Sequence, residues 1–210
     1  MGKIISIVNQ KGGVGKTTTT INLAAALAMY KQKVLVIDYD QQANATIGLG
    51  INREDILFDI ADFFTHIGLL KKAILKTSIQ NLFIIPATIK LASVEESLYT
   101  IEDKEYLLSQ KLKKIKNDYD YILIDCPPSL GLITLNAFTA SNSVLIPVQC
   151  EYYALEGLGQ LLNTIKLVKK HLNKNIEIEG ALLTMFDTRT NLSKQVVDEV
   201  VKNGNIILFI

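Results

Sequence analysis

Hydrophobic residues are grouped along this chain in short, nearly unbroken runs of strand length. The runs consist mainly of valine, isoleucine and leucine and lack the polar–apolar alternation of a strand that faces water on one side. Such runs are typical of parallel sheets that helices cover on both faces. The pattern predicts strands at Ile4–Val8, Val34–Ile37, Leu82–Ile85, Tyr121–Ile124, Ser143–Val148 and Ile178–Thr184.

Longer amphipathic segments separate these runs. They predict helices at Thr18–Tyr30, Glu54–Thr65, Lys104–Lys116, Leu132–Ala140, Leu155–His171 and Leu192–Val201. Strands that alternate with helices indicate βαβ units, and therefore an α/β fold with a doubly wound, mostly parallel sheet. Ligands of such sheets bind beyond the carboxyl ends of the strands. No linker, repeat or low-complexity stretch divides the chain, so we expect a single domain over residues 1–210.

Composition and charge narrow the possible functions. The 210 residues carry a net charge of only +1, so a nucleic-acid contact would need a local basic patch. Two basic clusters, Lys111–Lys116 and 166–171, close predicted helices, where cations also stabilise the helix dipole. Cys126 and Cys150 have no metal-site spacing and are expected to be buried thiols in a reducing cytosol. Because no apolar run approaches the ~20 residues of a membrane span, we expect a cytoplasmic protein without membrane association.

A glycine-rich loop joins the first predicted strand to the first predicted helix. Glycines let a backbone wrap closely around phosphates, and the N–H groups then point at the anion. Lys16 would reach the β- and γ-phosphates, and Thr17 would offer its hydroxyl to Mg²⁺. The candidate nucleotide-binding residues are Lys11, Gly12, Gly13, Val14, Gly15, Lys16, Thr17 and Thr18.

Aspartates stand where two other predicted strands end. Asp38 and Asp40 follow the second strand, and Asp125 follows an apolar run in the Walker B arrangement that holds Mg²⁺ and its waters. Asp38 and Asp40 can face one way, toward a metal or an attacking water. Aspartate also forms turns at strand ends, and for Asp40 that alternative stays open.

The loop departs from the usual pattern G-x-x-x-x-G-K-[ST], because Gln10 takes the place of the first glycine and Lys11 follows it. This K-G-G-x-G-K-[ST] loop resembles the deviant Walker A class of P-loop ATPases, which includes the ParA/Soj partition proteins, MinD and the nitrogenase iron protein. The resemblance implies that Lys11 crosses a dimer interface and contacts the phosphates of the partner's nucleotide. It therefore implies a homodimer that forms with ATP.

The same resemblance implies roles for residues at the other strand ends. Asp40 would position the hydrolytic water, and Asp38 would lie beneath the hydration shell of the metal. Family members usually have proline where this chain has Gln41, which removes a steric bias toward extended backbone at the preceding residue. Asp187 and its neighbour Met185 would approach the adenine, although the segment around Asp187 also suits a helix start.

Two further stretches, Asp125–Gly131 and Pro147–Leu158, resemble chromosomal Soj-type partition ATPases. The implied activity is Mg²⁺-dependent hydrolysis of ATP to ADP, weak without a partner, in chromosome or plasmid segregation. The implied partners are a ParB-type centromere-binding protein and non-specific DNA, which would bring the protein to the nucleoid. A MinD-like regulator and a remnant that hydrolyses nothing are the alternatives.

The chain ends differently from the family. Family members continue through a P-R-N-V-R-type strand and loop that wraps the adenine, and then a final helix, whereas this chain ends in the apolar stretch Gly204–Ile210. We expect that this family segment is missing, together with some of the basic residues used for DNA binding. An unpaired Ile-Ile-Leu-Phe-Ile strand would also be prone to aggregate.

Overall fold

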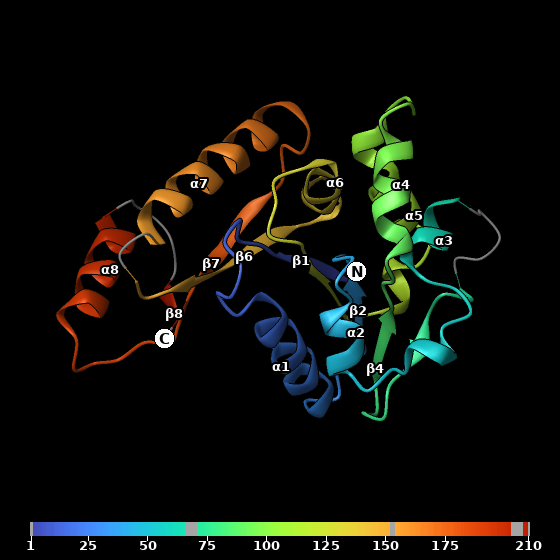
Figure 1. Ribbon diagram of the computed structural model, residues 1–210, viewed down its shortest axis with the longest axis horizontal. Helices are drawn as coiled ribbons and strands as arrows, with labels where there is room; N and C mark the ends of the chain where they lie inside the picture. Colours follow the sequence, from blue (N-terminus) through green and yellow to red (C-terminus); the bar gives the residue numbers. More distant parts are fainter. Residues whose placement is uncertain (1, 66–70, 152–153, 203–207, 210) are drawn as a thin grey trace.

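The computed structural model describes residues 2–65, 71–151, 154–202 and 208–209, and its centre is one mainly parallel sheet (Figure 1). The strand order is β3-β4-β2-β5-β1-β6-β7-β8, and every pairing is parallel except that of β3 with β4. The α/β prediction and the six predicted strands are confirmed. The strands are β1 Lys3–Ile7, β2 Val34–Asp38, β3 Leu75–Lys76, β4 Leu82–Ile85, β5 Tyr121–Asp125, β6 Ser143–Gln149, β7 Glu177–Thr184 and β8 Leu208–Phe209.

The register of the central strands brings the acidic strand ends together. Ile7 of β1 pairs with Asp125 of β5, and Asp125 also pairs with Asp38 of β2. All five residues of β2 are buried, which explains why this run carries no alternation. The loop after β1 and both aspartates therefore lie at the same edge of the sheet.

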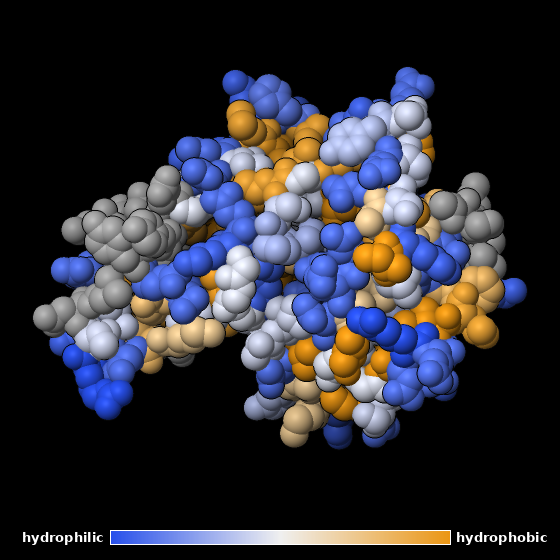
Figure 2. Space-filling model, viewed as in Figure 1, coloured by the Kyte–Doolittle hydropathy of each residue, from blue (hydrophilic) through white to orange (hydrophobic). Residues whose placement is uncertain are grey.

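Helices cover both faces of the sheet (Figure 1). α1 and α2 contribute to the core on one face, while α3 to α7 contribute to the core on the other. The surface between α2, α4 and α6, near the centre of the view, is mainly hydrophilic in Figure 2. The helices are α1 Lys16–Met29, α2 Asn44–Gly48, α3 Ile60–Thr65, α4 Lys90–Leu98, α5 Leu107–Leu112, α6 Leu132–Ala140, α7 Ala154–His171 and α8 Asn191–Lys202. None of the helices in the described ranges is both long and apolar enough to cross a membrane.

The predicted helix over Glu54–Thr65 is wrong in its first half. A single 3₁₀ turn occupies Arg53–Asp55, and α3 begins only at Ile60. The reason is a capping box at Asp59: its Oδ1 accepts hydrogen bonds from the backbone N–H groups of Ala61 and Asp62, and Asp62 Oδ2 accepts from the N–H of Asp59.

The predicted helix over Lys104–Lys116 is interrupted as well. It consists of a 3₁₀ turn at Lys104–Tyr106, then α5, and a second 3₁₀ turn at Lys116–Asp118. The short elements α2, α4 and β3 were not predicted. In α4, the buried residues Leu91 and Leu98 are seven positions apart, which is a helical spacing on one face.

The expectation of an unpaired C-terminal strand is wrong for the two residues of it that the structure describes. Leu208 and Phe209 form β8, which pairs in parallel with Ala181 and Leu182 of β7. The outer edge of the sheet on this side is therefore β8. The other residues of the Gly204–Ile210 stretch lie outside the described residues.

Candidate functional site

The glycine-rich loop starts in the crevice between β1 and β6. Asn9, which is buried, donates from Nδ2 to the carbonyl of Pro147 at 2.7 Å and accepts from the Lys11 N–H at 3.0 Å. The chain runs from β1 through α1 to β2 on one side, and from β6 through α7 to β7 on the other. The loop therefore lies at the point where the connections diverge, the usual ligand site of such sheets.

Two glycines give the loop its shape. Gly13 and Gly15 have φ values of 77° and 88°, in the left-handed region that favours glycine. A Cβ added at Gly13 would meet no atom within 4 Å, so this part of the loop faces open space. On the opposite side β7 supports the loop, because Thr184 Oγ1 donates to the carbonyl of Val14 at 2.9 Å.

Lys16 lies inside the curve of this loop. Its side chain is mostly buried, and Nζ donates to the carbonyl of Lys11 at 2.8 Å. Burial lowers the pKa of Lys16, while the nearby carboxylates of Asp125 and Asp40 oppose that shift. A buried ammonium group beside exposed backbone N–H groups is suited to an anion with several charges.

Asp125 connects β5 to the first turn of α1. Its Oδ2 accepts from Thr17 Oγ1 at 2.7 Å, and its Oδ1 accepts from Thr20 Oγ1 at 3.0 Å. Burial raises the pKa of Asp125 to about 6, although both hydroxyl hydrogen bonds oppose this.

The described residues contain no group of three or more histidine, cysteine, aspartate or glutamate side chains that could hold a metal. Thr17 and Asp125 place a hydroxyl and a carboxylate side by side next to the loop, and a cation there could bind both, with water and phosphate oxygens as further ligands. Few protein ligands and several water or phosphate ligands are the preference of Mg²⁺. The residues present thus fit this metal.

Asp38 is fully buried, and its carboxylate accepts hydrogen bonds from neighbouring residues of the protein. Its Oδ2 accepts from Thr46 Oγ1 at 2.6 Å and from the Thr46 N–H at 2.7 Å, and Oδ1 accepts from the Asp40 N–H at 3.3 Å. Burial raises the pKa of Asp38 to about 7. In this structure Asp38 fixes the turn that carries Asp40, and its role under a metal stays a prediction.

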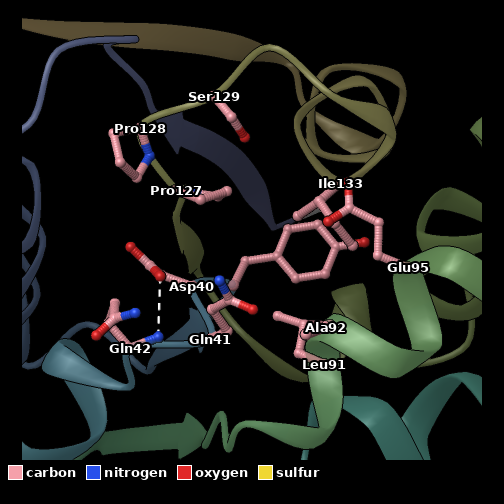
Figure 3. A pocket seen from close by; sticks show the side chains of 11 residues that line it. Asp40, Gln41, Gln42, Leu91, Ala92, Glu95, Pro127, Pro128, Ser129 and Ile133 are labelled. Carbon is pink, nitrogen blue, oxygen red and sulfur yellow. Dashed lines mark hydrogen bonds between the residues drawn. The ribbon is translucent and has the colours of Figure 1, made fainter.

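Asp40 is half-buried and lies on the turn after β2 (Figure 3). Its Oδ1 accepts a hydrogen bond from the Gln42 N–H at 2.9 Å, which is the turn geometry anticipated as the alternative. Oδ2 takes no part in that bond. The turn and a role for Asp40 toward water are therefore compatible, and the latter stays a prediction.

Lys11 forms an ion pair that the sequence did not reveal. Its ammonium group contacts Glu151 Oε1, and both side chains are partly exposed, at 40% and 32%. Beside it, Gln10 Nε2 donates to Gln160 Oε1 at 2.9 Å and to the Gly157 carbonyl at 3.2 Å. The start of the loop is thus docked on α7 within one subunit.

The segment around Asp187, which the resemblance places near the adenine, directly follows β7, the strand that supports the loop. Met185 has a φ of 53° and is 66% exposed. Asp187 pairs with Arg189 at 2.7 Å, and its backbone carbonyl accepts from the Thr190 N–H. Thr190 Oγ1 then accepts from the Ser193 N–H, so these residues form the start of α8. Contact of Met185 and Asp187 with adenine stays a prediction.

Three supporting residues were missed by sequence reasoning. Thr184 ends a strand and could have been found from the topology, because the carboxyl ends of parallel strands share one edge. Thr46 lies eight residues after Asp38, and its contact depends on the short helix α2, which no pattern predicted. The ion pair of Glu151 with Lys11 could not be predicted from the sequence, because a single glutamate after a strand is common and has no distinctive pattern.

A strand, a glycine loop around a buried lysine, and a hydroxyl paired with an aspartate on a neighbouring strand define the class as P-loop nucleotide-binding proteins. A family model described as an AAA domain matches residues 2–178. The sporulation initiation inhibitor protein Soj of Bacillus subtilis is 57% identical over 202 residues, which are 96% of this chain and 80% of that protein. The chromosome partitioning protein ParA of Myxococcus xanthus is 51% identical, over 95% of this chain and 71% of that protein.

Structural comparison agrees. The crystal structure of cobyrinic acid a,c-diamide synthase from Mycobacterium smegmatis with bound ATP analog and magnesium has a TM-score of 0.92 and 36% identity. The match covers 84% of that chain and 98% of this chain. The chain belongs to the ParA/Soj family of partition ATPases, as the loop resemblance indicated.

Proposed function

We propose that this protein binds ATP with Mg²⁺, hydrolyses it to ADP and phosphate, and uses the cycle to switch between a monomer and an ATP-sandwich dimer during chromosome or plasmid segregation. The observation that carries the proposal is the cluster at the loop: Lys16 is buried within the curve, and Thr17 is bonded to Asp125 beside it. ATP and Mg²⁺ are also the chemistry named for a related structure.

Each residue of the cluster has a separate task. The N–H groups of the loop and the ammonium of Lys16 bind the phosphates, and the N-terminus of α1 adds its positive dipole end. When bound, Mg²⁺ supplies positive charge next to the phosphate oxygens. Thr17 and Asp125 would hold it, and Asp40 would orient the attacking water. Catalysis would then depend on position and electrostatics.

Dimerisation would depend on Lys11. This residue stands where the ordinary loop pattern needs no charge, and its side chain is partly exposed beside Glu151. To contact a phosphate of a second subunit it must leave Glu151, which is a modest cost for a partly exposed pair. The switch would thus exchange an ion pair within one subunit for a charge-assisted contact between subunits.

The partners follow from the family. A ParB-type centromere-binding protein would activate hydrolysis, and non-specific DNA would serve as the track, which would place the dimer at the nucleoid. Support comes from the relatives, which are chromosome partitioning proteins by name. A net charge of +1 gives no general attraction to DNA, so a local basic surface would be required.

The test is Asp40→Ala with ATP binding and hydrolysis measured separately. We expect near-normal ATP affinity by calorimetry and a fall in phosphate release of about 100-fold, as for loss of one positioned catalytic group. Asp55→Ala is the control, because Asp55 lies on an exposed turn of the same connection. Unchanged turnover in Asp40→Ala would contradict the assigned role, and absence of ATP binding by the parent protein would contradict the proposed function.

A further inference from the structure

A small cavity lies next to the phosphate site, on the far side of the Asp40 turn. Its volume is about 230 Å³, and it lies between α4, the turn after β2 and the loop after β5 (Figure 3). Asp40 and Glu95 are on opposite sides of it, and Pro127 and Ser129 lie on the loop above Asp40 in this view. The residues that bind phosphate in our proposal do not line it.

The size and charge of the cavity restrict what could occupy it. Pockets for nucleotides and other small molecules usually span ~300–1,000 Å³, so this space suits one long side chain better than a whole ligand. Among the described residues that line it, only Asp40 and Glu95 are charged, and both are acidic. The surrounding surface is mainly hydrophilic (Figure 2). The cavity therefore favours a cationic group.

The lining also contains an unsatisfied polar group. Tyr39 is fully buried, and its hydroxyl has no hydrogen-bond partner in the described part of the chain. Burial raises the pKa of Tyr39 well above its usual value, so the hydroxyl is neutral and can accept a hydrogen bond. The carboxylate of Glu95 likewise has no hydrogen bond or ion pair with any described residue. Buried hydroxyl groups without partners are rare in folded proteins and require an explanation.

We propose that this cavity is the binding site for one arginine side chain of a partner protein, whose guanidinium group pairs with Glu95 and donates to the hydroxyl of Tyr39. A guanidinium group is planar and carries five N–H donors, so it can bind a carboxylate with two of them and still reach a second acceptor. The stem of the arginine would lie along the apolar part of the lining, which includes Leu91 and Ile133.

Binding here would act on the turn that carries Asp40. Tyr39 directly precedes Asp40, and the backbone N–H of Tyr39 donates to the carbonyl of Asp125 at 2.9 Å. An arginine fixed against Tyr39 would therefore restrict the turn on which the proposed hydrolysis depends. This last step rests on the proposed function, whereas the binding step does not.

Binding is tested on the full chain without nucleotide, by NMR titration with N-acetyl-arginine amide and with its neutral isostere N-acetyl-citrulline amide. We expect the arginine compound to shift the backbone signals of Gln41, Gln42 and Ala92, with a dissociation constant in the millimolar range. The citrulline compound should bind at least about fivefold more weakly, because it lacks the charge.

Two variants and one control test whether the Glu95 carboxylate and the Tyr39 hydroxyl bind the arginine compound. Glu95→Gln should weaken binding of the arginine compound at least about fivefold, while Glu96→Gln, on the exposed side of the same helix, should leave it unchanged. Tyr39→Phe should weaken binding but leave the stability of the fold equal or higher, because the hydroxyl it removes has no partner. Equal shifts with citrulline, or unchanged binding in Glu95→Gln, would overturn the proposal. Because no ATP is present, these results are independent of whether the protein hydrolyses ATP.

Discussion

A substitution of Thr46 gives a quantitative test of what stabilises the turn after β2, which carries Asp40. Its hydroxyl donates to Asp38 Oδ2 at 2.6 Å and accepts from the Ala87 N–H at 3.0 Å, and Thr46 and Asp38 are both fully buried. Thr46→Val keeps the shape of the side chain and removes both bonds. The carboxylate then loses one donor, and the Ala87 N–H is left without a partner.

The expected cost follows from these two losses. A hydrogen bond to a charged group contributes roughly 1.5–3 kcal/mol, and an unsatisfied buried N–H costs roughly 1–3 kcal/mol. Thr46→Val should therefore lower the free energy of unfolding by about 3–5 kcal/mol at pH 8, where Asp38 is ionised because its pKa is about 7.

The assay is urea denaturation of the nucleotide-free protein, with Thr46→Ser as the matched control. Serine keeps the hydroxyl and loses one methyl group, which should cost only about 1 kcal/mol. A loss below about 1 kcal/mol in Thr46→Val, or equal losses in the two variants, would refute the role given to this hydroxyl.

Two other predictions concern charge. Lys16→Ala should abolish ATP binding in calorimetry, since it removes the buried cation of the loop, and near-normal affinity would mean that nucleotide binds elsewhere. For Asp38, the folded pKa of about 7 exceeds the usual unfolded value, so the folded state holds a proton that unfolding releases. Its contribution to stability is complete below about pH 4 and is lost as the pH rises to about 7, by up to about 1.4 kcal/mol per pH unit. Denaturation of the metal-free protein between pH 4.5 and 8 should show this slope, and Asp38→Asn should reduce it; an equal slope in the variant would contradict the assignment.

Much of the fold could be predicted from the sequence because buried parallel strands need unbroken apolar runs. The runs Val34–Ile37 and Tyr121–Ile124 predicted strands in this way, and in the structure each strand extends one residue further, to Asp38 and Asp125. The helix predicted over Glu54–Thr65 starts too early, because the capping residue Asp59 lies inside that range and the true helix begins only after it. The short helix α2 has too few residues to show a period.

The details of the site depend on contacts that are distant in sequence. Thr184 reaches the loop at Val14 across 170 positions, and Glu151 pairs with Lys11 across the sheet edge. The cavity at Tyr39 exists only because α4 packs beside two loops. None of these contacts leaves a local pattern: the position of Thr184 follows only from the strand topology, and the other two are seen only in the folded structure.

The central claim is that Lys11 acts on a second subunit, and sedimentation velocity of Lys11→Ala with ATP and Mg²⁺ tests it most directly. Each of two symmetric contacts to phosphate should contribute roughly 1.5–3 kcal/mol, so dimerisation should weaken at least about 100-fold. The fold should be nearly unaffected, because the pair with Glu151 is partly exposed. Lys31→Ala, which changes an exposed lysine outside the loop, is the control. We predict that Lys11→Ala binds ATP but stays monomeric, while the parent protein and Lys31→Ala form dimers; a Lys11→Ala protein that dimerises normally would contradict the account.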